Sequence, residues 1–137
     1  MRREQRCALA VMLLLPMVAG CSDREEHRLE GEWVWVSAEG GHLMDHVTTE
    51  LGQGLSLDLN EGSFTAMMSN DAVAEGTYTV SGEAVAARSG TEGSTLIFSS
   101  APPTLNASEW VIRSRGDTLW LLTLMEDGFD HAFVRLR

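Results

Sequence analysis

Short runs of alternating apolar and polar residues, separated by turn-forming residues, fill the chain from residue 31 to its end. Leu55 to Leu59 alternates strictly, and Asn60-Glu61-Gly62-Ser63 then turns the chain into Phe64 to Met68. Residues 76–80 alternate in the same way. Because alternation with a period of two places successive side chains on opposite faces of a strand, this pattern predicts antiparallel strands joined by tight turns.

The segments that follow this pattern are rich in aromatic and β-branched residues, which favour strands. They are residues 32–37, 55–59, 64–68, 76–80, 84–88, 95–99, 109–113, 119–125 and 129–136. Segment 84–88 is the weakest, and we expect Ser81-Gly82-Glu83 to form the turn before it. The predicted fold is therefore all-β, a small antiparallel up-and-down barrel of eight or nine strands, which leaves no sheet edge exposed.

One stretch, from Gly40 to Gly54, departs from the strand pattern. Leu43, Val47 and Leu51 lie four residues apart, which is the spacing of one helical face. We therefore predict one short helix after the first strand.

His42, Asp45 and His46 fall on this predicted helix and are weak candidates for metal ligands. Two imidazoles four residues apart share a helical face and can hold one divalent ion. A solvated polar face explains the same spacing without a metal, and no third ligand falls in helical register. Weak metal binding is therefore only a minor alternative.

The first 20 residues have a different character from the rest. Three arginines among the first six residues precede an apolar run from Cys7 to Val18. A basic head and a short apolar run are typical of an export signal, and a run of about a dozen residues is too short to span a bilayer. Residues 1–20 are therefore predicted to be a cleaved signal peptide.

The residues Val18-Ala19-Gly20-Cys21 resemble the lipobox of bacterial lipoproteins. The resemblance implies that the Cys21 thiol receives diacylglycerol, that cleavage precedes Cys21, and that the new amino terminus carries an acyl chain such as palmitate. Two or three acyl chains anchor a protein stably. Ser22 follows the cysteine where an aspartate would retain such a protein at the inner membrane, so the resemblance favours the outer membrane of a Gram-negative host.

The mature chain is strongly acidic. Without residues 1–20 it has seven arginines, no lysine and 19 acidic residues, which gives a net charge of −12. Such a surface repels nucleic acid and anionic lipid headgroups, so attachment to the membrane must come from the lipid on Cys21. The polar segment 21–30 reads as a tether, and residues 31–137 form one domain. Cys7 is lost with the signal, so no internal disulfide is available.

Residues at the two ends of the predicted barrel resemble those of a lipocalin-like barrel. Gly31-x-Trp33 opens the first strand, Arg135 lies near the end of the last one, and Gly76-x-Tyr78-x-Val80-x-Gly82 is similar to the middle hairpins of bacterial lipocalin-like lipoproteins. The resemblance implies that Trp33 lies at the closed end of the barrel with the Arg135 guanidinium across its ring, a favourable cation–π contact.

No serine, cysteine or histidine falls in a recognisable catalytic motif, and there is no glycine-rich phosphate loop. The chain is therefore not expected to be an enzyme or to carry a cofactor. Our first hypothesis is a membrane-tethered domain that binds a small apolar ligand inside the barrel. Its candidate lining residues are Trp35, Leu57, Phe64, Tyr78, Phe98 and Trp110.

The same aromatic residues can instead fill a solid barrel, because eight strands enclose room for either arrangement. The alternative hypothesis is therefore an interaction or assembly module whose acidic outer surface docks an envelope protein.

Overall fold

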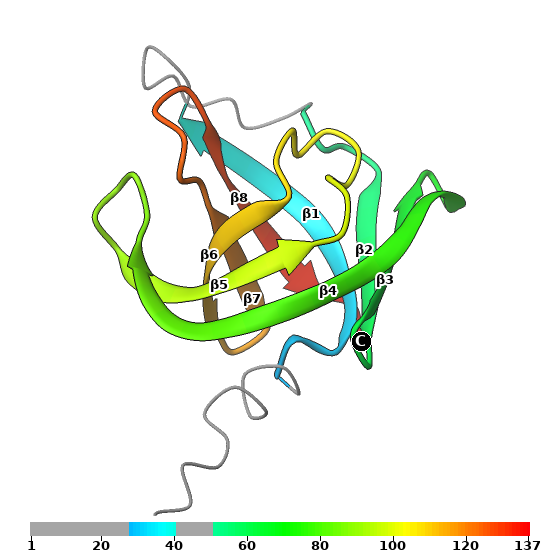
Figure 1. Ribbon diagram of the computed structural model, residues 1–137. Coiled ribbons are helices and arrows are strands. Elements are labelled where there is room, and N and C mark those ends of the chain that lie inside the picture. The colour runs from blue at the N-terminus through cyan, green and yellow to red at the C-terminus, as the bar shows by residue number, and fades with distance from the viewer. Residues whose placement is uncertain (1–27, 41–50) are drawn as a thin grey trace, which may run out of the picture.

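The computed structural model describes residues 28–40 and 51–137. They form a closed antiparallel barrel in which each strand pairs with the next along the chain and the last strand pairs with the first (Figure 1). The strands are β1 (Gly31–Gly40), β2 (Leu55–Asn60), β3 (Ser63–Met68), β4 (Asp71–Ala86), β5 (Glu92–Phe98), β6 (Glu109–Arg115), β7 (Thr118–Leu122) and β8 (Phe129–Arg135). The predicted all-β up-and-down barrel is confirmed, with eight strands.

The alternation seen in the sequence separates the inside of the barrel from the outside. In β2 the three leucines are completely buried, while the residues between them are partly or fully exposed. Large side chains from the other strands meet them and fill the middle of the barrel. These include Trp33, Phe64, Tyr78, Leu96, Phe98, Leu119, Leu121 and Phe133. Each such buried side chain contributes about 1.5–3 kcal/mol of hydrophobic stabilisation.

Strand β4 corrects one prediction. Ser81-Gly82-Glu83 is not a turn, and the two strands predicted at 76–80 and 84–88 are parts of one strand of 16 residues. Between Ser81 and Val85, β4 advances four residues while β5 advances two. The extra residues form an irregularity of the bulge type, and bulges bend a strand without ending it. A glycine inside a strand marks such a site as readily as it marks a turn.

The bend brings the tip of the β4–β5 hairpin against the outer face of β6 and β7. Ala87 is buried there with Val111 and Leu122, and Val85 and Trp120 pack around them. Trp110 points into the barrel, so the next residue, Val111, faces outward. This second hydrophobic cluster explains why Val111 is nevertheless completely buried.

Several predicted features lie outside the described residues. They include the signal peptide, Cys21 and most of the tether, and also most of the predicted helix with His42, Asp45 and His46. The described end of that stretch, residues 51–54, is a turn in which the Leu55 amide donates to the Gly52 carbonyl at 2.9 Å. Among the described residues, no helix has the length and apolar character needed to cross a membrane.

One end of the barrel is closed by Trp33 and Arg135, which face each other across β1 and β8. The Arg135 guanidinium carbon lies 4.3 Å from the centre of the Trp33 ring. The same guanidinium donates hydrogen bonds to the Glu30 carbonyl and, at 2.6 Å, to the Arg28 carbonyl. The Trp33 indole donates to the Leu29 carbonyl at 2.7 Å. The pair therefore ties the segment before β1 to the end of β8, in the arrangement that the lipocalin resemblance implies.

Gly31 gives a physical reason for the Gly-x-Trp spacing. Its φ is +131°, and a Cβ placed there would lie 2.5 Å from an Arg135 guanidinium nitrogen. Only glycine combines that backbone conformation with room for the arginine to pass.

We expect Arg135→Ala to lower the free energy of unfolding by about 2 kcal/mol, because it removes the cation–π contact and two charge-assisted hydrogen bonds. Arg137→Ala is the matched control. Arg137 pairs with Asp117, but its side chain is 80 % exposed, so its removal should change stability by less than about 0.5 kcal/mol. Urea unfolding of both variants measures the difference, and equal effects would show that the pair does not close the barrel.

Candidate functional site

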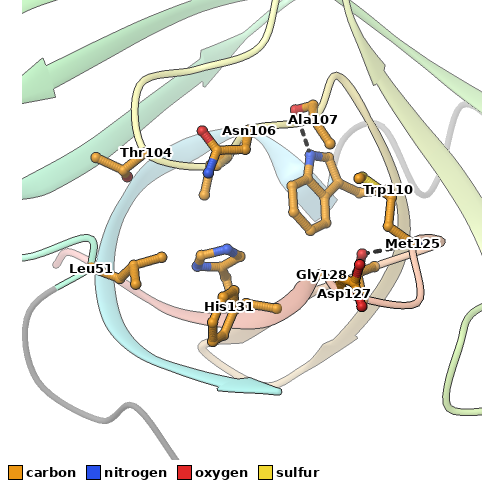
Figure 2. Close-up of a pocket in the computed structure, with 12 residues that line it drawn as sticks. Leu51, Thr104, Asn106, Ala107, Trp110, Met125, Asp127, Gly128 and His131 are labelled. Atoms are coloured by element: carbon orange, nitrogen blue, oxygen red, sulfur yellow. Dashed lines mark hydrogen bonds between the residues drawn. The ribbon is translucent and has the colours of Figure 1, made fainter. Parts of the chain in front are cut away.

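A cavity of about 150 Å³ lies at the end of the barrel opposite Trp33 and Arg135. The turn before β2, the β5–β6 loop and the β7–β8 loop surround it, together with side chains from β6 and β8 (Figure 2). Its lining residues are Leu51, Thr104, Leu105, Asn106, Ala107, Trp110, Thr123, Met125, Asp127, Gly128, Phe129 and His131. Six of these side chains are apolar and five are polar, with Gly128 completing the lining.

His131 on β8 is a titratable group that lines this cavity, with 1 % of its surface exposed. Its Nδ1 accepts a hydrogen bond from the Trp35 indole at 3.0 Å. The Trp110 ring meets its imidazole edge-on, with the ring centres 5.4 Å apart. Figure 2 shows the imidazole standing in the cavity between Leu51 and Trp110.

The Trp35 contact determines which nitrogen of His131 carries the proton. An indole N–H can only donate, so Nδ1 must have a free lone pair and the neutral imidazole must be protonated at Nε2. No hydrogen bond found within the described part of the chain uses Nε2. His131 therefore offers the cavity an N–H donor.

Burial lowers the pKa of His131 from 6.5 to about 4. Protonation would also set two N–H groups face to face, because Nδ1 already receives the Trp35 hydrogen. At neutral pH the group in the cavity is therefore a neutral donor and carries no charge.

A bulge in β1 makes room for the His131 ring. Trp35 lies opposite Phe133, but the register then shifts, so that Ala38 and not Ser37 lies opposite His131. Because of this shift, the next buried side chain after Trp35 is that of Ala38, three residues further along β1. A methyl group thus faces the imidazole, and the ring can extend toward the cavity.

The turn before β2 packs directly on Trp35. A Cβ at Gly52 would lie 2.6 Å from the indole ring, so any larger residue would displace either the turn or the tryptophan. Gly52 therefore lets Leu51 reach the cavity while the turn covers Trp35.

Thr104, in the β5–β6 loop, presents a second unusual polar group. Its Oγ1 is buried and has no hydrogen-bond partner among the described residues. Its φ is +70°, and Asn106 follows with a φ of +59°. A β-branched residue rarely adopts this left-handed conformation, and such strain is concentrated at functional sites.

The opposite rim, residues 123–128, is held by several hydrogen bonds. The Thr123 amide donates to the Asp130 carboxylate at 2.8 Å, and the Thr123 hydroxyl accepts from the Met125 amide at 3.1 Å. From the β4–β5 hairpin, Arg88 donates to the Gly128 carbonyl at 2.6 Å. The rim is therefore formed before any ligand arrives, which lowers the entropic cost of binding.

The six candidate lining residues lie in two regions. Trp110 lines the cavity, and Trp35 touches it through His131. The other four are buried in the packed middle of the barrel and are not among the lining residues. They are Leu57, Phe64, Tyr78 and Phe98.

The sequence pattern assigns no role to His131 or Thr104. For His131 a signal was available, because it lies two residues before Phe133 on the same strand and therefore on the same inward face. For Thr104 there was none, since its importance comes from a loop conformation that no local pattern specifies.

Metal ligation has no candidate in this part of the molecule. No group of three or more histidine, cysteine or acidic side chains that could hold an ion occurs among residues 28–40 and 51–137.

No protein-family model matches this chain, and searches of curated proteins and of solved structures also found no match. The fold itself places the chain among closed eight-stranded antiparallel barrels. Its function has to be inferred from the cavity.

Stability should depend on the protonation of His131. The pKa is about 4 in the folded protein and 6.5 without burial, so between these values the unfolded chain binds more protons. The contribution of neutral His131 to the free energy of unfolding is therefore fully present above pH 6.5. As the pH falls to 4 this contribution is lost, and the loss is about 3 kcal/mol in all.

His131→Asn isolates this effect. Its amide oxygen can still accept from Trp35, but the side chain does not titrate, whereas the acidic residues titrate in both proteins. The difference between the two free energies of unfolding, measured from pH 7 to pH 4, should therefore shrink as the pH falls. A constant difference would mean that His131 does not have the lowered pKa.

Proposed function

We propose that this chain is a membrane-tethered envelope lipoprotein that binds a small, mostly apolar ligand at the open end of its barrel, without catalysis. The observation that carries the proposal is the preformed cavity of about 150 Å³ with Trp110, Leu105, Phe129 and Leu51 around it. Pockets of this kind, apolar with a few converging polar groups, are typical of small-molecule sites.

The size of the cavity limits the ligand. An engineered apolar cavity of about 150 Å³ in another protein holds one benzene molecule. The barrel beneath the cavity is filled by completely buried side chains such as Leu57 and Phe133, so an extended acyl chain has no space to enter. The ligand class is therefore compact, of roughly the size of a six-membered ring with one or two substituents.

Binding can be tested with benzene on the mature chain from Ser22, which contains all eight strands of the closed barrel. We expect saturable binding, seen as amide shifts confined to the cavity rim and as a rise in the melting temperature.

Ala107→Met should reduce benzene affinity at least tenfold, because the longer side chain occupies the cavity that Ala107 lines. Ala72→Met, at an exposed position of β4, is the matched control and should bind like the wild type. Absence of saturable binding in the folded wild-type chain would contradict the proposal.

The membrane tether rests on different support, namely the lipobox resemblance at Cys21 and the net charge of −12, which leaves no electrostatic route to an anionic membrane. We expect cells fed an alkyne-labelled palmitate to label the wild-type protein and Cys7→Ser, but not Cys21→Ser. Cys7 lies in the predicted signal and so controls for the loss of a thiol. Equal labelling of all three proteins would refute lipidation at Cys21.

A second candidate function is an interaction module that docks through a basic groove, not through the acidic surface that the sequence suggests, and one observation favours it. The outer face of β6 and β7 carries a groove of about 320 Å³ beside Trp120, where Arg113 and Arg115 bring positive charge to an acidic protein. Such a groove suits an acidic protein segment. In-cell crosslinking of the wild type and an Arg113→Glu, Arg115→Glu double variant tests it, and it requires a crosslinked partner that the double variant loses.

A further inference from the structure

Two polar groups of residues that line the cavity can serve a ligand. One is the Nε2–H of His131 on β8, for which the described residues show no hydrogen bond, and the other is the Thr104 hydroxyl in the β5–β6 loop, which is buried without a partner there. They come from separate elements, and the two line the same small space. Because an unsatisfied buried hydroxyl is destabilising, the Thr104 side chain calls for a specific explanation.

The chemistry of His131 limits what can satisfy it. The Trp35 indole occupies Nδ1, so Nε2 can act only as a donor. The complementary ligand atom must therefore be an acceptor. A hydroxyl can donate as well as accept, so the Thr104 O–H can donate to the second lone pair of the same ligand oxygen.

The rim of the cavity argues against a charged acceptor. Asp127 lines the cavity, and Glu126 and Asp130 lie in or beside the same loop. Arg88 lies 3.9 Å from the Asp130 carboxylate. The groups that would receive the ligand, the His131 N–H and the Thr104 hydroxyl, are neutral, so they would not compensate the desolvation of a carboxylate.

We propose that the ligand is a compact neutral molecule with one carbonyl-type oxygen, which accepts the His131 Nε2 hydrogen bond while its apolar part packs against Trp110 and Phe129. This inference rests on the proposed function, since it specifies the ligand of the same cavity. The Thr104 hydroxyl gives the oxygen a second contact, so orientation as well as size is selected.

Cyclohexanone and methylenecyclohexane test this directly, because they have nearly the same shape and differ in having an oxygen or a methylene group at one position. Dissociation constants for the mature chain from Ser22 are measured by amide shifts. Water retains the ketone more strongly than the alkene, so a cavity without a donor would favour the alkene. We expect the ketone to bind at least as tightly as the alkene, and cyclohexanecarboxylate to bind much more weakly than either.

Variants then assign the preference to particular groups. In His131→Asn the amide oxygen can still accept from Trp35, but the side chain ends short of the cavity, so ketone affinity should fall about tenfold relative to the alkene. Thr104→Val keeps the β-branched shape and should lower the affinity for the ketone relative to the alkene about threefold. Thr79→Val, at an exposed position of β4, should leave it unchanged.

The imidazole ¹⁵N spectrum of His131 provides a readout that needs no variant to fold. We expect Nε2 to be protonated and its resonance to move with cyclohexanone but not with methylenecyclohexane.

The outcomes separate the two proposals. If the alkene binds more tightly and Nε2 does not respond to the ketone, the carbonyl assignment is wrong while the cavity remains a binding site. Tighter binding of the carboxylate would overturn the neutrality of the ligand. If none of the probes saturates, the proposed function and this inference fail together.

Discussion

The pairing of β1 with β8 is the contact on which the rest of the molecule depends. It joins strands from opposite ends of the domain and closes the barrel, so that no sheet edge is left among the described strands. The same ladder builds both ends. It sets Arg135 opposite Trp33 at the closed end and lets Trp35 reach His131 at the open end. Stability and the candidate site therefore come from one strand pair, with a bulge after Trp35 separating the two roles.

Much of the barrel could be predicted because its cause is local. The leucines of β2 alternate with polar residues, and that period alone decides which side chains enter the core. The bend in β4 could not be predicted, because a Ser-Gly-Glu segment suits a turn and a bulge equally. Packing of Ala87 on Val111, at the outer face of the barrel, selects the bulge. Only tertiary structure contains that information.

The site was harder to foresee than the fold. An apolar ligand cavity was expected among the aromatic residues, yet Phe64 and Phe98 pack edge-on with their ring centres 5.0 Å apart in the filled core. Space is left open beside Trp110, at one end of this core. The residues that give this space its chemistry, His131 and Thr104, owe their importance to a tautomer and a strained loop. Neither property can be read from residue type or spacing.

In this proposal the Nε2–H of His131 donates a hydrogen bond to a neutral ligand oxygen in the cavity. A crystal structure of the mature chain soaked with cyclohexanone would locate the ligand oxygen. We expect the ketone oxygen within hydrogen-bond distance of His131 Nε2, with Trp35 still donating to Nδ1. A cavity that holds only water, or a ketone whose oxygen points away from His131, would contradict it.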